Sequence, residues 1–519
     1  MFDPEFYVGA WRAQDGTWAT CKYADSASGV EGSDEQVVWE RRVFHVIPVP
    51  GEALWAVPPS AGLPPPGPAA QRSAEKRCRD SASAEDDVSM DTGTTATDDM
   101  HTPGHGTPGA ATGDSKKPRA AEAAADGAAA AGDAAAARGL PASASGSHVL
   151  LKVYGSQAAD IKLNEVLDCV CVLSVAPEAA TFGPSGADFG EEEEAHNPPH
   201  SAVPRLHAIL VARAPPPGLT GLTLTPSLAA EPRAACVRLL TAACGGDALA
   251  GEYLLLHLVS RVHSRPDPFA VGCLSLNLQL PKGTSDADAA CLVSCLWPLL
   301  TALVPRTVAL SLTVGGLNAG PLAPHKCYVT NTLVHAPLQL APGTHLLVDE
   351  TGLSPGQLDG VGVKNIQALR DIITCQKVDV DFQFYSTTLP TDAPVLTCSR
   401  SNSLLPADVV IPVRCTSQPA CSPQQQLGDP QAMAPLRAYL AAARHAPHAI
   451  EADVAAHVEA DLVASRAADA SLGQEDFHRW LTLARLLATS AGEQALSTAT
   501  WTRARQLEAA AVQRRRSER

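Results

Sequence analysis

Basic residues, aromatic residues and metal-ligand spacings are all scarce in this sequence. Lysine and arginine number 39 against 55 aspartates and glutamates, a formal charge of −16, and aromatic residues make up 4% of 519 positions. A general nucleic-acid-binding protein presents a basic face, so this balance disfavours direct nucleic-acid binding, although a local basic patch stays compatible with it. None of the 14 cysteines forms a Cys-x-x-Cys pair, and the 16 histidines complete no zinc-ligand spacing. We therefore expect no metal site, and we interpret the cysteines as small buried hydrophobic residues in a reducing compartment.

Long apolar runs are missing as well. The longest, residues 291–305, is too short to span a bilayer and contains Pro298. The sequence therefore predicts no membrane association.

Residues 58–146 lack aromatic residues and are dominated by Pro, Ala, Gly, Ser and Asp. Such a segment cannot bury enough apolar surface to offset chain entropy, so we predict a long disordered insert. It contains two basic clusters, which are candidate nuclear-import signals or, alternatively, parts of a merely solvated tether. Their basic residues are Lys76 and Arg77 in the first cluster, and Lys116, Lys117 and Arg119 in the second.

Alternating strand-like sequence flanks this insert. Residues 1–57 and 147–178 are predicted to form the two parts of one β-domain of the oligonucleotide-binding type (OB-like), which the insert interrupts. Such barrels bind single strands on aromatic platforms, but the second part offers only Tyr154. An acidic loop, residues 179–203, follows it.

Residues 204–416 alternate between strands and helices, which implies an α/β core with a mostly parallel sheet. The predicted strands are 206–212, 274–280, 307–314, 345–349, 378–384, 395–397 and 409–413, and the predicted helices are 231–244, 250–263, 288–303 and 362–375. After a linker, residues 417–434, the remaining residues 435–519 are predicted to form a helical domain. Its helices are expected at 436–443, 449–465, 474–490 and 498–511.

The most informative stretch is residues 345–351, a short apolar run that ends in two adjacent carboxylates, Asp349 and Glu350. Pro-Gly pairs before and after it mark turns. The pattern predicts a buried parallel strand with its acids at the carboxyl end, where ligands bind in open α/β sheets. Nucleotide hydrolases place an Asp there to hold Mg²⁺ and often a Glu to position water. The alternative is a strand capped by a solvated acidic turn.

A phosphate loop, Gly-x4-Gly-Lys-Ser/Thr ahead of a helix, would complete such a site. Gly246 and Gly251 have this spacing and precede a predicted helix, but Glu252 stands where the Lys is needed and Tyr253 where the small hydroxyl is needed. A carboxylate facing a triphosphate is repulsive. These degenerate positions, followed by the Asp-Glu strand and a helical bundle, suggest a catalytically inactive relative of a ring ATPase that has no catalytic residues and no cofactor.

Segments spread over the chain resemble the mini-chromosome maintenance (MCM) complex-binding proteins. They are residues 1–7, 46–52, 246–247, 252–258, 347–351, 357–359, 376–379, 403–408 and 484–508. Together they cover nearly the whole chain outside the linkers. Members of the family carry further sequence before the first of these segments, so we expect that the start of this chain is truncated or misassigned.

The resemblance implies a nuclear, non-enzymatic partner of the MCM helicase subunits, with only indirect contact to chromatin. Such partners act in helicase assembly, subunit stability or unloading, and in sister-chromatid cohesion. It also implies the layout of a helicase subunit: an OB-like region, a degenerate AAA+-like core and C-terminal helices. Helicase subunits place an arginine finger in a Ser-Arg-Phe-Asp stretch, and the comparable residues 405–408 contain no Arg. Two alternatives remain open, an active AAA+-type ATPase and a single-strand-binding OB protein.

Overall fold

The computed structural model describes residues 5–57 and 203–415 with short gaps, together with 137–138, 149–174 and 432–518. Nearly all of the predicted insert and of the two connecting segments 179–203 and 417–434 lies outside these residues. The candidate import residues Lys76, Arg77, Lys116, Lys117 and Arg119 lie outside them too.

A six-stranded sheet joins the sequence on the two sides of the insert. Its strands, in spatial order, are β2 (Trp18–Thr20), β1 (Glu5–Arg12), β3 (Gln36–Val46), β5 (Val149–Tyr154), β7 (Arg205–Arg213) and β6 (Leu167–Ser174). β3, before the insert, pairs antiparallel with β5, after it. β7 was expected to open the α/β core but instead pairs with β5 and β6. That expectation is wrong because an alternating pattern identifies a strand without specifying its sheet.

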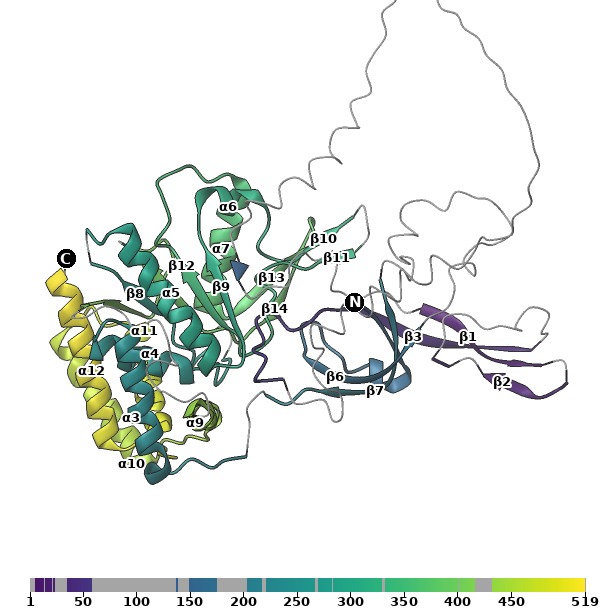
Figure 1. Ribbon diagram of the computed structural model, residues 1–519. Helices are drawn as coiled ribbons and strands as arrows, with labels where there is room; N and C mark the ends of the chain where they lie inside the picture. The colour runs from purple at the N-terminus through teal and green to yellow at the C-terminus, as the bar shows by residue number, and fades with distance from the viewer. Residues whose placement is uncertain are drawn as a thin grey trace, which may run out of the picture. The chain divides into compact units, whose positions relative to one another are not determined.

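The α/β core is built on a second six-stranded sheet (Figure 1). Its order is β16 (Val409–Pro412), β8 (Leu276–Gln279), β15 (Val395–Ser399), β12 (His345–Asp349), β9 (Thr307–Ser311) and β4 (Ala137–Arg138). The first five strands are parallel, as predicted. β4 pairs antiparallel with the edge strand β9. It lies within the segment predicted to be disordered, so that prediction is wrong at these two residues, because edge pairing uses backbone groups and needs no apolar side chain.

A smaller four-stranded sheet extends from the core. Its order is β11 (Thr332–Val334), β10 (His325–Cys327), β13 (Lys377–Asp381) and β14 (Ser386–Pro390). β13 was expected among the core strands, but it forms an antiparallel hairpin with β14. The β13–β14 hairpin and the β10–β11 hairpin meet where β10 pairs with β13.

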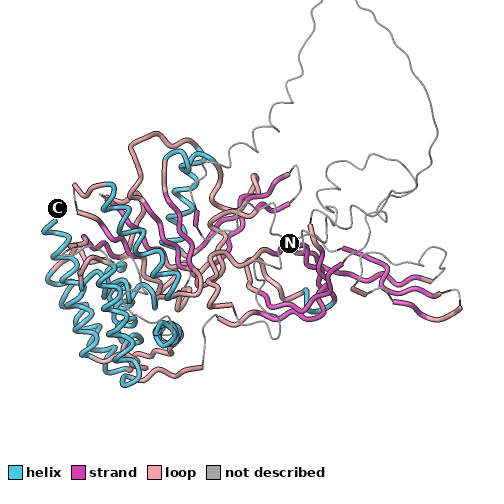
Figure 2. The backbone as a smooth tube through the Cα atoms, in the orientation of Figure 1, coloured by secondary structure: helices cyan, strands magenta, loops and turns pink. Residues whose placement is uncertain are grey.

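Helices cover both faces of the core sheet (Figure 2). Alternate residues of β12 separate the layers: Leu347 packs with α3 (Pro226–Ala243), α4 (Ala248–Val259) and α5 (Asp286–Leu303), whereas Leu346 and Val348 pack with α7 (Gly360–Cys375). A short helix, α6 (Val314–Ala319), packs beside α7.

The C-terminal helices belong to the layer of α3 and α4, and they share its apolar cluster. They are α9 (Met433–His445), α10 (Ala452–Ala468), α11 (Gln474–Ser490) and α12 (Thr498–Glu518), close to the predicted ranges. Trp480, Ala484 and Leu487 of α11 are buried in this cluster, which confirms the apolar face predicted for residues 474–490.

Candidate functional site

The strand that ends in Asp349 and Glu350 is β12, in the interior of the core sheet. It is buried and parallel to both neighbours, as the sequence predicted. The carboxylate of Asp349 accepts hydrogen bonds from the backbone N–H and the hydroxyl of Thr351, at 2.9 and 2.6 Å. Asp349 therefore closes the turn that follows the strand.

The carboxyl group of Glu350 is directed into the protein, and the residue is only 6% exposed. Burial raises its pKa, while the hydroxyl of Ser403 and the backbone N–H groups of Leu404 and Leu405 oppose that rise by hydrogen bonding. One carboxylate oxygen has no hydrogen-bond partner among the described residues. Glu350 thus holds the loop after β15 against the end of β12, where a water-positioning Glu would stand in a hydrolase.

The carboxyl end of β8 leads directly into α5, so this strand–loop–helix unit occupies the place where an open α/β sheet would bind phosphate. Ser285 caps α5 by accepting a hydrogen bond from the Asp288 N–H at 3.1 Å. Asp288 places a carboxylate in the first turn, which repels a phosphate there. Arg400, just after β15, donates to the carbonyl of Thr284 in the same loop at 2.7 Å.

The predicted remnant of a phosphate loop lies elsewhere. Gly246 is in the turn between α3 and α4, and Gly251, Glu252 and Tyr253 are inside α4. No strand precedes this turn, so the assignment is wrong. The glycine spacing has two separate causes: Gly246 has a φ of +88°, and a Cβ on Gly251 would lie 2.8 Å from the backbone N of Thr241 in α3.

The polar residues of this turn hold the C-terminal helix α12. Asp247 caps α4 by accepting from the N–H groups of Leu249 and Ala250, and it forms an ion pair with Arg514. Glu252 forms ion pairs with Arg233 of α3 and with Arg503 of α12, the latter at 3.3 Å. The Tyr253 hydroxyl lies 3.5 Å from the carboxylate of Glu508. The residue types that differ from a phosphate loop are therefore those that bind α12.

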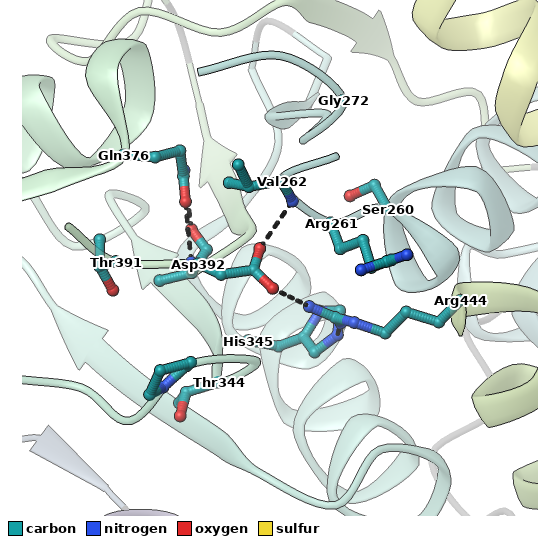
Figure 3. A network of polar contacts seen from close by, with 12 residues as sticks. Ser260, Arg261, Val262, Gly272, Thr344, His345, Gln376, Thr391, Asp392 and Arg444 are labelled. Atoms are coloured by element: carbon teal, nitrogen blue, oxygen red, sulfur yellow. Dashed lines mark hydrogen bonds and ion pairs between the residues drawn. The ribbon is translucent and has the colours of Figure 1, made fainter. Parts of the chain in front are cut away.

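A polar network unpredicted from the sequence joins α9 to the other end of the core sheet (Figure 3). Arg444 donates from one guanidinium nitrogen to His345 Nε2 at 2.6 Å and from another to Asp392 at 3.2 Å. Asp392 also accepts from the N–H of Val262, just after α4, at 2.9 Å. His345 begins β12, so the network links four segments that are distant in sequence.

Two buried histidines lie at the centre of this network, with His257 packed edge-to-face on His345. Burial lowers the pKa of His257 to about 4 and holds the pKa of His345 well below its ordinary value. Arginine can only donate, so His345 Nε2 accepts and its proton is on Nδ1. The carbonyl of Leu274 can only accept, so His257 also carries its proton on Nδ1, at 2.8 Å. Both rings are neutral structural groups.

A cavity of about 280 Å³ lies beside the network. Apolar side chains such as Leu258, Leu303 and Leu440 line it together with Arg437 and Arg444. The guanidinium of Arg437 donates to a backbone carbonyl at 2.7 Å and lies 4.1 Å from the centre of the Trp55 ring. Both arginines are engaged within the protein, Arg444 by Asp392 and Arg437 by this carbonyl and the Trp55 ring.

Comparison with known proteins places the chain in a family. The model of the mini-chromosome maintenance replisome factor family matches residues 1–515. The chain belongs to this family. Relatives named mini-chromosome maintenance complex-binding protein include those of Arabidopsis thaliana and Salmo salar, each 35% identical over 98% of this chain and 85% of the relative. The Homo sapiens relative is 32% identical over 98% of this chain and 86% of its own length. The resemblance noted in the sequence is thereby confirmed.

The described residues can also be compared with the requirements of a metal site and of a membrane-spanning helix. Within them, no group of three or more His, Cys, Asp or Glu side chains could hold a metal ion. No single helix of the described residues is long and apolar enough to cross a membrane, and only the pair α3 and α4, bent by 120°, meets that test together.

Proposed function

We propose that this protein is a non-enzymatic binding partner of the MCM helicase subunits and acts in DNA replication. The proposal extends to the nucleus as the site of action, to assembly, stability or unloading of helicase subunits, and to a role in sister-chromatid cohesion. It is supported by membership of a family whose relatives are named for binding the MCM complex.

We infer that the core is a degenerate AAA+-like domain. In spatial order, β15 separates the strand that leads into α5 from the strand that ends in Asp349 and Glu350. By analogy at the level of the fold, ring ATPases share this placement of an extra strand between their phosphate-loop strand and their Asp-Glu strand. The observation that carries the non-enzymatic interpretation is that the protein's own groups engage the acids at this edge of the sheet. Asp349 binds Thr351, Glu350 binds the loop at residues 403–405, and Asp288 faces the phosphate position.

The position expected for an arginine finger is also used structurally. Asp408 accepts from the N–H and the hydroxyl of Ser275 at 2.8 and 2.7 Å, ahead of β8. Hydrolysis at a shared interface needs a phosphate-loop Lys from one side and an Arg from the other. Loss of the Arg alone costs about 10³–10⁵ in rate, so we expect no measurable turnover.

An affinity pull-down from nuclear extract tests the binding proposal. The tagged full chain should enrich MCM subunits over a tag-only control, with the co-purifying subunits identified by mass spectrometry. Recovery of no MCM subunit would refute it.

An ATPase assay on the chain, alone and with one bound subunit, tests the inactive site. Turnover that disappears in Asp349→Ala would establish the active-ATPase alternative instead.

The aromatic rings of the β-domain bear on the alternative function, single-strand binding. Tyr7 and Tyr23 pack edge-to-face on Tyr154, with centroids 5.6 and 5.2 Å away, so the structure brings together more aromatic rings than the sequence suggested. Tyr154 is only 5% exposed and offers no open ring face for a base to stack on. Tight binding of an oligonucleotide with a steep salt dependence would favour this alternative.

Nuclear import through the two basic clusters is part of the proposal. Replacement of Lys76, Arg77, Lys116, Lys117 and Arg119 by Ala should shift a fluorescent fusion of the chain to the cytoplasm. An unchanged nuclear signal would mean that import depends on a partner or on another segment.

A further inference from the structure

The hairpin formed by β13 and β14 ends in a cluster of exposed aromatic rings. Phe382, Phe384 and Tyr385 lie in its turn, and Tyr328 follows β10 in the adjoining hairpin. Phe384 is 82% exposed, Tyr385 61% and Tyr328 45%, in a chain with only 4% aromatic residues. Single exposed hydrophobic residues are ordinary on a protein surface, but a contiguous group of this kind marks an interaction site. We call these four residues the aromatic tip.

Contacts within the aromatic tip fix its shape. The rings of Phe382 and Tyr385 stack with centroids 4.8 Å apart and planes 3° from parallel. Tyr328 packs edge-to-face on Phe384 at 6.0 Å, and its hydroxyl donates to the carbonyl of Phe382 at 2.6 Å. The turn itself is closed by the Phe382 N–H, which donates to the carbonyl of Tyr385 at 2.9 Å. Rings held in this way lose little conformational entropy when a partner covers them.

Folding of the core does not account for the aromatic tip. Its members are absent from the apolar clusters on both faces of the core sheet. The hairpin is secured by other means: Gln383, with a φ of +65°, donates its backbone N–H to Asp381 at 2.7 Å, and β13 pairs with β14 over its whole length. Packing of the core therefore does not depend on Phe384 and Tyr385, whose ring contacts lie within the aromatic tip.

The charges around the aromatic tip point to a protein partner. Lys364 pairs with Asp381 at 3.1 Å and Lys377 with Asp379 at 3.8 Å, so the charged pairs beside the tip balance one another. A nucleic acid needs uncompensated cations along its backbone, which these pairs do not supply. A surface of exposed rings flanked by these ion pairs is complementary to an uncharged apolar pocket, the setting in which aromatic anchors dominate binding energy.

We propose that the aromatic tip is an anchor that inserts Phe384 and Tyr385 into an apolar pocket on a subunit of the MCM complex. This inference rests on the proposed function, because that function supplies the partner. Tyr328 and Phe382 act as positioning residues that hold the two anchor rings outward.

The test uses the full chain and purified MCM subunits. The double variant Phe384→Ser with Tyr385→Ser should bind at least about 30-fold more weakly than the unaltered chain, since one hot-spot residue is worth ≥ ~2 kcal/mol and each ~1.4 kcal/mol is tenfold. Phe269→Ser is the matched control, because Phe269 is an aromatic residue 52% exposed elsewhere on the core. The control should bind within about twofold, and both variants should keep the unfolding midpoint of the parent, as surface changes do.

Four outcomes would overturn the inference. If the parent binds MCM subunits and the double variant binds them equally well, the anchor lies elsewhere while the proposed function stands. If the parent binds no subunit, the proposed function itself fails. If light scattering shows a parent dimer that the double variant loses, the aromatic tip is a contact between copies of this chain. A binding constant that depends little on salt would support apolar anchoring, and a steep salt dependence would contradict it.

Discussion

Replacement of Glu252 separates the two interpretations of the α3–α4 turn. The structure uses this carboxylate to pair with Arg233 and Arg503, with the Glu252 side chain 12% exposed and that of Arg233 16%. Breaking a fully buried pair costs ~3–5 kcal/mol because one charge is left uncompensated. Arg233 retains some contact with water and donates to Ser490 at 3.2 Å, so the cost should be smaller than for a fully buried pair. We therefore expect Glu252→Gln to lower the free energy of unfolding by about 2–3 kcal/mol.

Urea denaturation followed by circular dichroism measures this loss, with Glu459→Gln as control. Glu459 is exposed on α10, and its replacement should change stability by no more than about 0.5 kcal/mol. Glu252→Lys restores the residue that a phosphate loop requires, yet it brings three cations together and should destabilise the protein further without creating ATP binding. A Lys variant of parental stability that binds ATP would refute the reasoning and restore the phosphate-loop interpretation.

Three further predictions follow from the same contacts. Burial lowers the pKa of His257 to about 4, below its ordinary 6.5, so the unfolded chain binds more protons than the folded chain between these pH values. The free energy of unfolding should therefore fall as the pH drops from 6.5 to about 4. Urea midpoints measured across this range test the prediction. Gly251→Ala should lower the thermal midpoint, since its Cβ would lie 2.8 Å from α3 backbone; an unchanged midpoint would show that the helices separate freely. Arg444→Leu removes the cation that pairs with the carboxylate of Asp392, and it should lower the free energy of unfolding, measured by urea denaturation, by several kcal/mol. Arg466→Leu, at an exposed position on α10, is the control and should change it by almost nothing.

Local pattern was sufficient to identify most elements of the core. The apolar run before Asp349 predicted β12 with its parallel pairing and buried position, and helical spacing predicted α5, α7 and α11 nearly to their ends. These features depend on the periodicity of apolar residues within one element, which can be read directly from the sequence. The membership of β7 and β13 in other sheets was missed, because pairing partners are chosen by contacts between segments far apart in the chain.

The site residues show the same contrast between features of one element, which the sequence predicts, and contacts between distant segments, which it does not. Arg444 lies 99 residues from His345 and 52 from Asp392 in the sequence. The residues next to each of the three in the sequence give no sign that they contact one another. Glu252 was noticed only as a departure from a motif. Its actual partners, one of them 251 residues away in α12, give the reason for that departure.

The proposed absence of turnover leaves the presence of Asp349 and Glu350 to be explained, and their contacts supply an explanation. The carboxylate of Asp349 ends a buried strand by binding Thr351, and that of Glu350 secures the loop at residues 403–405 against it. Replacement of Asp349 would leave the N–H and hydroxyl of buried Thr351 without this acceptor, at a cost of ~1–3 kcal/mol for each group. The Asp-Glu pair is therefore compatible with a binding protein, and its presence does not argue for hydrolysis.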